Sequence, residues 1–293
     1  MIKSQKSFLN EEIGCLYLIP TPIGNLEDMT FRAIRILKEV NYIAAEDTRN
    51  SKKLCNHFEI TTPLISYHEH NKEKVGTKIV EDLKKGMKVG LVSDAGMPCI
   101  SDPGYELVNL CLEEGISVVP LPGANAALTS LISSGLPTDS FLYIGFLPRQ
   151  KKDKKKHLEL LKGQRSTVLL YESPHRLKET LQSISEVLGN RKIVLCRELT
   201  KKFEEFLRGS VSDAIDWAVN EEIRGEFVIV LEGASEEEVA NHHGESWWEA
   251  LSINEHVDWY INEKGESSKE AIKLVAKDRA LHKRDVYAEY HGL

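Results

Sequence analysis

Short apolar runs alternate with amphipathic stretches through the first half of the chain, and most of the apolar runs end in loops rich in glycine, proline and polar residues. Residues 16–19 and 88–92 are two of the apolar runs, and helical patterns follow at 28–40 and 104–114. Uninterrupted apolar strands are typical of parallel sheets that are covered on both faces. The alternation therefore predicts an α/β fold with a mostly parallel sheet and covering helices.

The chain divides into three regions by pattern. We expect a first α/β domain at 1–146 that carries the cofactor and catalytic loops, a second at 147–234, and a small helical appendage at 245–293. Residues 235–244 are polar and acidic and are interpreted as a hinge. In the first domain, the helix at 28–40 is expected to turn four residues towards the core: Phe31, Ile34, Ile36 and Leu37.

The tail from Glu245 onward has the pattern of a helix-turn-helix and is expected to be entirely helical. Apolar residues from Trp247 to Ile261 predict a first helix. Ser267, with Glu270 three residues later, forms a capping box ahead of a second. A third helix is expected near His282, although histidine is a poor N-cap. Its first residues, Lys283 and Arg284, are candidate RNA contacts, and solubility is the alternative explanation for them.

Composition excludes several classes of protein. The 293 residues contain no apolar run near the roughly 20 residues that span a bilayer, and residues 1–10 lack the apolar core of a signal peptide. The five cysteines are scattered and form no C-x-x-C pair, which predicts neither a disulfide frame nor a zinc site. We expect a cytoplasmic protein with no metal site.

A net charge of −7 means that any nucleic-acid surface must be local. The densest basic segment is 149–157, where six of nine residues are Lys or Arg. It predicts RNA contacts, and a solvated loop or exposed helix start is the alternative. The candidates are Arg149, Lys151, Lys152, Lys154 and Lys155.

Four loops follow predicted strands and carry residues suited to a ligand. They lie at 20–30, 46–51, 93–104 and 122–127, and they combine glycine and small residues with Asp, Glu and Asn. Ligands of open α/β sheets bind beyond the carboxyl ends of the strands, so these loops predict a cofactor cleft. None of them reads G-x-G-x-x-G, which argues against a dinucleotide. Each loop alone is also explained as a rigid turn.

Six segments together resemble the tetrapyrrole-methylase superfamily: I-P-T-P-I-G-N-L-E-D-M-T, A-A-E-D-T-R, S-D-A-G-M-P-C-I-S-D-P-G, P-G-A-N-A, Y-E-S-P-H-R and R-G-E-F. Within it, the chain resembles the branch that methylates a cytidine 2′-hydroxyl in 16S (small-subunit) ribosomal RNA. The resemblance covers about 15–233, and the tail resembles that branch's C-terminal extension. It implies two α/β domains with a cleft between them, S-adenosyl-L-methionine as the methyl donor, and a homodimer.

The resemblance also implies which residues contact the methyl donor. Carried over by position, they are Ile23, Asp94, Ala95, Met97, Asn125, Ala126, Glu172, Leu199 and Phe227.

The proton acceptor for a ribose hydroxyl is a separate question. Asp47 is the first candidate because it aligns with a carboxylate proposed as a base in tetrapyrrole-methylating relatives, and Glu46 and Glu172 are second choices. Arg49 and Arg176 are expected to orient carboxylates or to bind phosphate. His175 is a candidate proton shuttle or a structural residue. For stacking on a target base, Tyr67 and Tyr171 are both candidates.

Three other functions remain open at this point. A methylase of a corrin precursor is disfavoured because a small macrocycle needs neither the basic segment nor the helical tail. A diphthine-synthase-like activity is disfavoured by the Y-E-S-P-H-R loop. A non-catalytic RNA-binding protein is disfavoured by the polar residues of the Asp47 and Asp94 loops.

Overall fold

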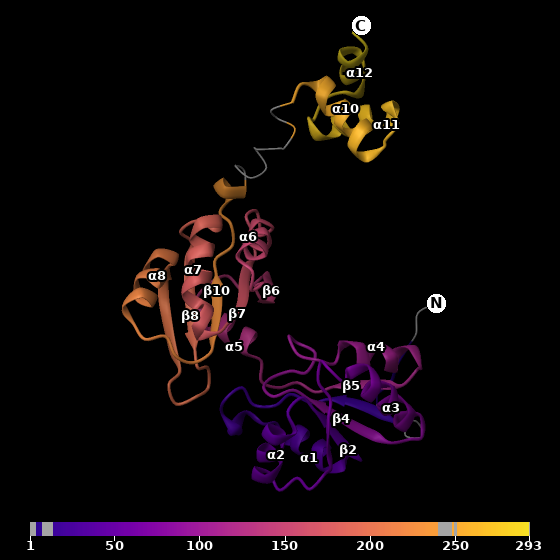
Figure 1. Ribbon diagram of the computed structural model, residues 1–293, viewed down its shortest axis with the longest axis vertical. Helices are drawn as coiled ribbons and strands as arrows, with labels where there is room; N and C mark the ends of the chain where they lie inside the picture. Colours follow the sequence, from indigo (N-terminus) through magenta and orange to yellow (C-terminus); the bar gives the residue numbers. More distant parts are fainter. Residues whose placement is uncertain (1–3, 8–13, 240–247, 249–250, 293) are drawn as a thin grey trace. The chain divides into compact units, whose positions relative to one another are not determined.

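The computed structural model describes residues 4–7, 14–239, 248 and 251–292. These fall into two compact units, which are considered separately (Figure 1). An α/β unit contains two sheets and comprises the chain up to Leu161 together with Ser166–Gly233, and a helical unit comprises Lys162–Arg165 and the chain from Ala234. None of the helices in the described part of the chain is long and apolar enough to cross a membrane.

The first sheet contains five strands in the order β3-β2-β4-β1-β5, all of them parallel. Their bounds are β1 (Cys15–Leu18), β2 (Tyr42–Ala45), β3 (Leu64–Ser66), β4 (Lys88–Val92) and β5 (Ser117–Pro120). Because the strands are parallel, the loops that follow β1, β2, β4 and β5 lie at one edge of the sheet. The sequence-based prediction of a parallel, covered sheet is therefore confirmed for this part of the unit.

Helices cover both faces of the first sheet (Figure 1). On one face, η1 (Leu26–Asp28), α1 (Phe31–Glu39) and α2 (Thr48–His57) follow β1 and β2, and buried residues of α1 and α2 share a core cluster with Ile19 and Val92. On the other face, α3 (Lys72–Lys84) and α4 (Tyr105–Glu113) bury Ile79, Leu83 and Leu107 against β1 and β4. Helices cover both faces of the sheet, which explains the continuous apolar sequence of its strands.

One predicted core residue lies on the surface. Phe31 is 94% exposed, whereas Ile36 and Leu37 are buried as predicted and Ile34 is partly buried. The helix begins at Phe31, with Thr30 as its N-cap, and Ala33 rather than Phe31 occupies the inward position of the first turn.

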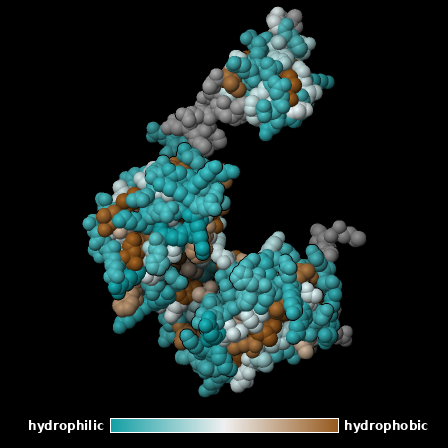
Figure 2. Space-filling view, viewed as in Figure 1, coloured by the Kyte–Doolittle hydropathy of each residue, from teal (hydrophilic) through white to brown (hydrophobic). Residues whose placement is uncertain are grey.

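The second sheet contains strands in the order β6-β7-β10-β8-β9, where β6 is parallel to β7 and the other neighbours are antiparallel. Their bounds are β6 (Phe141–Phe146), β7 (Thr167–Glu172), β8 (Lys192–Arg197), β9 (Glu205–Ser210) and β10 (Phe227–Leu231). The helices α6 (Lys151–Glu159), α7 (Pro174–Leu188) and α8 (Val211–Asn220) pack on one face, and α5 (Ala126–Ser134) packs on the other. Figure 2 shows a largely hydrophilic surface with a few separate hydrophobic patches.

The helical unit contains α10 (Ile253–Lys264), α11 (Ser268–Asp278) and α12 (Lys283–His291) around a small apolar core that includes Val257, Ile272 and Val286. The tail is not entirely helical, because Trp248 lies in a turn and α10 begins only after the Ser252 cap. Trp247 lies outside the described residues. Helix α12 follows His282, whose side chain makes no capping hydrogen bond.

Candidate functional site

A cavity with a volume of about 330 Å³ in the α/β unit is lined by loops of the first sheet and by strand ends of the second. Figure 2 shows the surface hollowed between the lobes that carry the two sheets. All nine residues that the family resemblance selects for the methyl donor line this cavity: Ile23, Asp94, Ala95, Met97, Asn125, Ala126, Glu172, Leu199 and Phe227. Residues far apart in sequence thus come together at one place, and the volume is within the usual range of ligand pockets, about 300–1,000 Å³.

The loops after β1 and β4 are held together by backbone hydrogen bonds. The Thr21 N–H donates to the Gly96 carbonyl (N···O 2.9 Å), and the Gly96 N–H donates to the Thr21 carbonyl (3.0 Å). Gly96 has φ +77°, and a Cβ there would meet the Ile23 side chain at 3.4 Å. A glycine is therefore needed at this point of the cavity wall, where the backbone is left-handed and faces a neighbouring loop.

Asp94 is held in place from the neighbouring helix. Its carboxylate accepts a hydrogen bond from the Asp47 N–H at Oδ1 and one from the Asn50 amide at Oδ2, both at 3.1 Å. Each carboxylate oxygen therefore has a donor from the start of α2. The predicted contact residue Asp94 is fixed in orientation before any ligand binds.

Two further carboxyl groups interact electrostatically with Asp94. Burial, together with the charges of Glu46 and Asp94, raises the pKa of Asp102 to about 6. The pKa of Glu46 is also raised, first by burial and then by Asp94. Asp102 lines the cavity, whereas Glu46 is not among its lining residues. A carboxyl group that titrates near 6 is suited to proton transfer at neutral pH.

Asp47 has a structural role at the start of α2. As the N-cap, its carboxylate accepts a hydrogen bond from the Arg49 N–H (2.8 Å), and it pairs with the Arg49 guanidinium (2.7 Å). These bonds lower the pKa of Asp47 to about 2. Neither residue lines the cavity, and the Arg49 side chain is 86% exposed. The assignment of Asp47 as the base stays a prediction.

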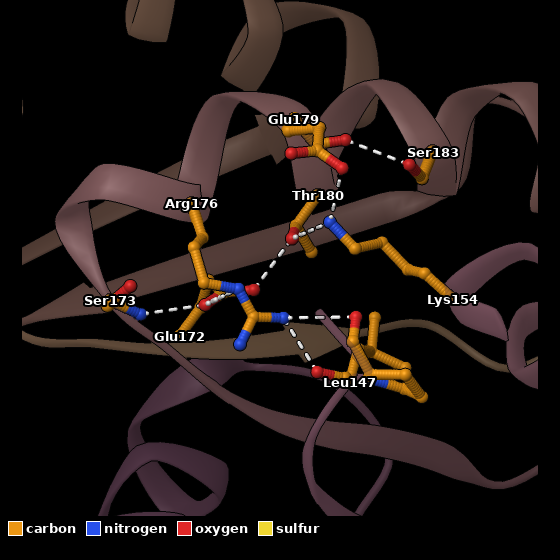
Figure 3. Close-up of polar contacts among 9 residues, drawn as sticks. Leu147, Lys154, Glu172, Ser173, Arg176, Glu179, Thr180 and Ser183 are labelled. Atoms are coloured by element: carbon orange, nitrogen blue, oxygen red, sulfur yellow. Dashed lines mark hydrogen bonds and ion pairs between the residues drawn. The ribbon is translucent and has the colours of Figure 1, made fainter. Parts of the chain in front are cut away.

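On the side of the second sheet, Glu172 is buried at the end of β7 within a polar network (Figure 3). Its carboxylate accepts hydrogen bonds from the Ser173 N–H (2.9 Å) and the Thr180 hydroxyl (2.6 Å), and Arg176 Nε lies 3.4 Å away. The Arg176 guanidinium also donates to the Leu147 carbonyl at 2.6 Å. Arg176 therefore connects Glu172 to the segment that precedes α6. One carboxylate oxygen of Glu172 accepts from Ser173 and lies near Arg176, and the other accepts from Thr180.

Lys154 corrects the prediction that the basic segment as a whole contacts RNA. Its side chain is fully buried in α6, where the ammonium group pairs with Glu179 (2.9 Å) and donates to the Thr180 hydroxyl (3.3 Å), as Figure 3 shows. A buried ammonium group cannot reach phosphate. Because Lys154 falls on the inner side of an amphipathic helix, it anchors α6 to α7 instead.

The other predicted RNA contacts lie at the surface. Arg149, Lys151 and Lys152 are exposed, and Lys155 is partly buried and paired with Glu186. In the helical unit, Lys283 and Arg284 are exposed at the first turn of α12. The structure therefore brings Arg149, Lys151 and Lys152 together on one segment next to β6.

The two aromatic candidates for base stacking differ in how deeply they are buried. Tyr67 is 1% exposed within the core under α3, so it cannot stack on a nucleotide and that candidate is wrong. Tyr171 lines the cavity and packs edge-to-face against Tyr143 and Phe146. His175 is exposed near the start of α7 and is not a lining residue of the cavity.

The sequence-based reasoning missed several lining residues. Asp102 belongs to a loop in which the Ser-Asp pair occurs twice, and that repetition was the available signal. In the turn after β8, Leu199 was predicted as a contact, but Glu198 was not; it lines the cavity and pairs with Lys201, another lining residue, at 2.9 Å. Both are ordinary charged residues, and only the sheet topology brings them to the cavity.

Comparison with known proteins agrees with this geometry. The family described as Tetrapyrrole (Corrin/Porphyrin) Methylases matches residues 15–215. Among solved structures, the uroporphyrin-III C-methyl transferase from Thermus thermophilus, complexed with S-adenyl homocysteine, is similar with a TM-score of 0.52 and 19% identity, covering 74% of this chain and 97% of that one. The chain belongs to the tetrapyrrole methylase family, and the predicted fold class is confirmed.

Curated relatives narrow the similarity further. A protein of Bacillus subtilis (strain 168) named ribosomal RNA small subunit methyltransferase I is 59% identical over 292 residues, which is 99% of both chains. A protein of the same name from Halalkalibacterium halodurans is 57% identical over 99% of both chains. The branch of the family that the motifs resemble is confirmed by these full-length similarities.

Proposed function

We propose that this protein transfers the methyl group of S-adenosyl-L-methionine to the 2′-hydroxyl of a cytidine in 16S ribosomal RNA. The observation that carries the proposal is full-length similarity, at 59% identity, to a protein named ribosomal RNA small subunit methyltransferase I. A corrin methylase is less favoured, because likeness to such structures is at 19% identity or below for those compared and reports the fold alone.

The cavity suits the proposed methyl donor. Small residues such as Ala95, Gly96 and Ala126 leave room for close backbone approach, and the apolar side chains of Ile23 and Leu199 offer surface to a purine. Carboxylates from both sheets, including Asp94 and Glu172, suit the positive charges of the sulfonium and amino groups. These groups are fixed by hydrogen bonds within the protein, so little ordering is needed on binding.

When bound, the donor supplies a methyl group on a positively charged sulfur, and transfer breaks the C–S bond as a C–O bond forms. The residues of the chain hold the two reactants in line and exclude water. The ribose hydroxyl loses its proton as it attacks, and a nearby base accelerates such a step by roughly 10²–10⁴-fold. The sulfur leaves as a neutral thioether, and the proton passes to the base.

We propose Asp102 as a base in place of Asp47. Asp102 lines the cavity next to Asp94, whereas Asp47 caps a helix and is paired with Arg49. At neutral pH the Asp102 carboxyl is ionised, yet it is basic enough to accept a proton because its pKa is about 6. A carboxylate with a pKa of about 2 accepts protons far less readily. Glu172, with its oxygens engaged by Ser173 and Thr180, is better suited to orienting the donor.

For the RNA we propose that exposed cations grip phosphates near the α/β unit. Arg149, Lys151 and Lys152 are the candidates there, and Lys283 and Arg284 are candidates in the helical unit. Since the proposed substrate belongs to the ribosomal subunit, we infer that the protein acts in the cytoplasm. A homodimer is the expected assembly, on the basis of the family resemblance.

The test is methyl transfer to purified small ribosomal subunits from a strain that lacks this gene, using donor with a labelled methyl group. We expect label at one cytidine ribose, located by its resistance to alkaline cleavage. Asp94→Arg should abolish donor binding in calorimetry with an unchanged circular dichroism spectrum. Label on a base, on protein or on no RNA at all would refute the proposal.

A further inference from the structure

Phe146 is an exposed aromatic side chain in the wall of the cavity. It is the last residue of β6, it is 53% exposed, and it lines the cavity together with Ile100, Ser101 and Asp102. None of these four residues is among the nine predicted donor contacts. Ile100 and Ser101 are exposed as well, so this part of the wall is accessible to a second molecule.

A bulge in β6 turns Phe146 towards the cavity. Side chains three positions apart in a regular strand point to opposite faces of the sheet. The register of β6 with β7 shifts between Tyr143 and Gly145, however. Phe146 and Tyr143 therefore lie on the same face, and both rings contact the ring of Tyr171, with centroids 5.7 and 5.1 Å from it. Bulges next to active sites commonly redirect a side chain in this way.

The bulge packs against the loop that carries the proposed base, Asp102. The hydroxyl groups of Ser101 and Tyr143 share a hydrogen bond of 2.7 Å. Gly145 has φ +73°, and a Cβ there would lie 2.9 Å from the Ser101 Oγ, so glycine permits this close approach. Burial raises the pKa of Tyr143 and of Tyr171, and the charge of Asp102 adds to both shifts. The rings on this face therefore lie close to the proposed base.

The segment that follows Phe146 is also held in place. The Arg176 guanidinium donates to the Leu147 carbonyl at 2.6 Å and to the Pro148 carbonyl at 3.3 Å (Figure 3). Phe146 is thus fixed from both sides, so its exposed ring keeps one position in the cavity wall.

Exposed cations follow the ring closely in sequence. Arg149, Lys151 and Lys152 lie within six residues of Phe146, and all three are exposed. Proteins that bind single-stranded nucleic acid combine these two features, because bases stack on aromatic side chains while cations contact the phosphates. Tyr171 supports the Phe146 ring edge-to-face and is itself only partly exposed.

We propose that the base of the acceptor cytidine stacks on the Phe146 ring, with its ribose directed into the cavity towards Asp102. The proposal rests on the proposed function and adds which residue positions the acceptor. Donor, acceptor and base then share one cavity, as in-line transfer requires. An unstacked, single-stranded nucleotide is the form in which RNA is usually read in a sequence-specific way.

The test compares Phe146→Ala with Phe146→Tyr and with a matched control, Phe141→Ala. Phe141 is the first residue of the same strand and is 43% exposed, but it does not line the cavity. The readouts are kcat and KM for methyl transfer to small ribosomal subunits from a strain that lacks this gene. Calorimetry with the methyl donor is the control for the rest of the cavity.

We expect Phe146→Ala to lower kcat/KM by about 10–100-fold, the usual contribution of one stacked base. Phe146→Tyr keeps a ring that can stack and should stay within about threefold of the wild type. Phe141→Ala should change kcat/KM by less than about twofold, as surface substitutions away from a site usually do. Donor affinity should stay within about twofold in all three variants.

A second measurement locates the acceptor directly. Phe146 or Phe141 is replaced by p-benzoylphenylalanine, a photo-crosslinking analogue of phenylalanine, and each variant is irradiated with the same subunits. From position 146 we expect a crosslink at the cytidine that the wild type methylates, or at the nucleotide beside it. From position 141 we expect no crosslink at that place.

Several results would overturn the role of Phe146 and leave the methyltransferase intact. These are equal kinetic effects of Phe146→Ala and Phe141→Ala, a loss in Phe146→Tyr as large as in Phe146→Ala, and a loss that follows weakened donor binding. A crosslink that is absent or far from the methylated cytidine would do the same. A crosslink from position 146 to one cytidine, without methyl transfer by the wild type, would instead overturn the proposed function. Failure of both crosslinking and methyl transfer would overturn both.

Discussion

Lys154 is fully buried and has a structural role, whereas Lys151 and Lys152 of the same basic segment are exposed. Lys154→Ala removes three buried methylene groups, and at about 0.8 kcal/mol for each this lowers the free energy of unfolding by about 2–3 kcal/mol. The Glu179 side chain, 51% exposed, regains water when its partner is lost and so adds little to this cost.

Two control variants isolate the cause. Lys154→Met keeps the side-chain volume and no longer buries an ammonium group. We therefore expect its free energy of unfolding to lie within about 1 kcal/mol of that of the wild type. Lys152→Ala changes an exposed residue of the same helix, and its stability should stay within about 0.5 kcal/mol. The assay is equilibrium urea unfolding followed by circular dichroism, together with RNA binding at one fixed salt concentration.

The reasoning predicts that Lys154→Ala loses stability, that Lys154→Met keeps it, and that Lys152→Ala instead weakens RNA binding. If Lys154→Ala were as stable as the wild type and lost RNA affinity to the same extent as Lys152→Ala, the buried role of Lys154 would be refuted.

Three further predictions concern the site and the helical unit. Asp102→Asn should lower kcat by about 10²–10⁴-fold, and the rate of this variant should no longer fall as pH drops through about 6. Asp47→Asn should retain most of the activity, and the reverse result would favour Asp47 as the base. The folded-state pKa of Asp102 is raised above 3.8, so its ionisation lowers the stability of the folded protein as pH rises from about 4 to about 6. Asp102→Asn should therefore raise the melting temperature at pH 7.5 and change it little at pH 4. An equal change at both pH values would contradict this. Removal of 245–293 should weaken RNA binding more than donor binding, and equal loss of both would mean that the helical unit is structural.

The fold was predictable where the sequence is locally consistent. Strand β4 has the predicted bounds, because its apolar run ends in a loop with glycine, proline and aspartate. Strands β6 and β9 were not predicted as strands. They lie at the edges of the second sheet, where half-exposed residues interrupt the apolar pattern.

The site was predictable in part for a different reason. The nine predicted donor contacts were selected by family resemblance. Six of them lie in loops that the parallel first sheet gathers at one edge, and Glu172, Leu199 and Phe227 come from strand ends of the second sheet. Burial was harder to predict: the chemistry of Lys154 and Tyr67 suggests exposed roles, but the helix face and the core position decide otherwise. The raised pKa of Asp102 depends first on its burial and then on the charge of Glu46, which is 56 positions away in the sequence and is brought near only by the fold.

The most direct measurement for the central claim is a crystal structure of the protein with S-adenosylhomocysteine, the demethylated form of the donor. We predict density in the cavity lined by Asp94, Ala126 and Leu199. Density for the ligand at any other place, or a cavity that stays empty under conditions in which calorimetry detects binding, would contradict the account.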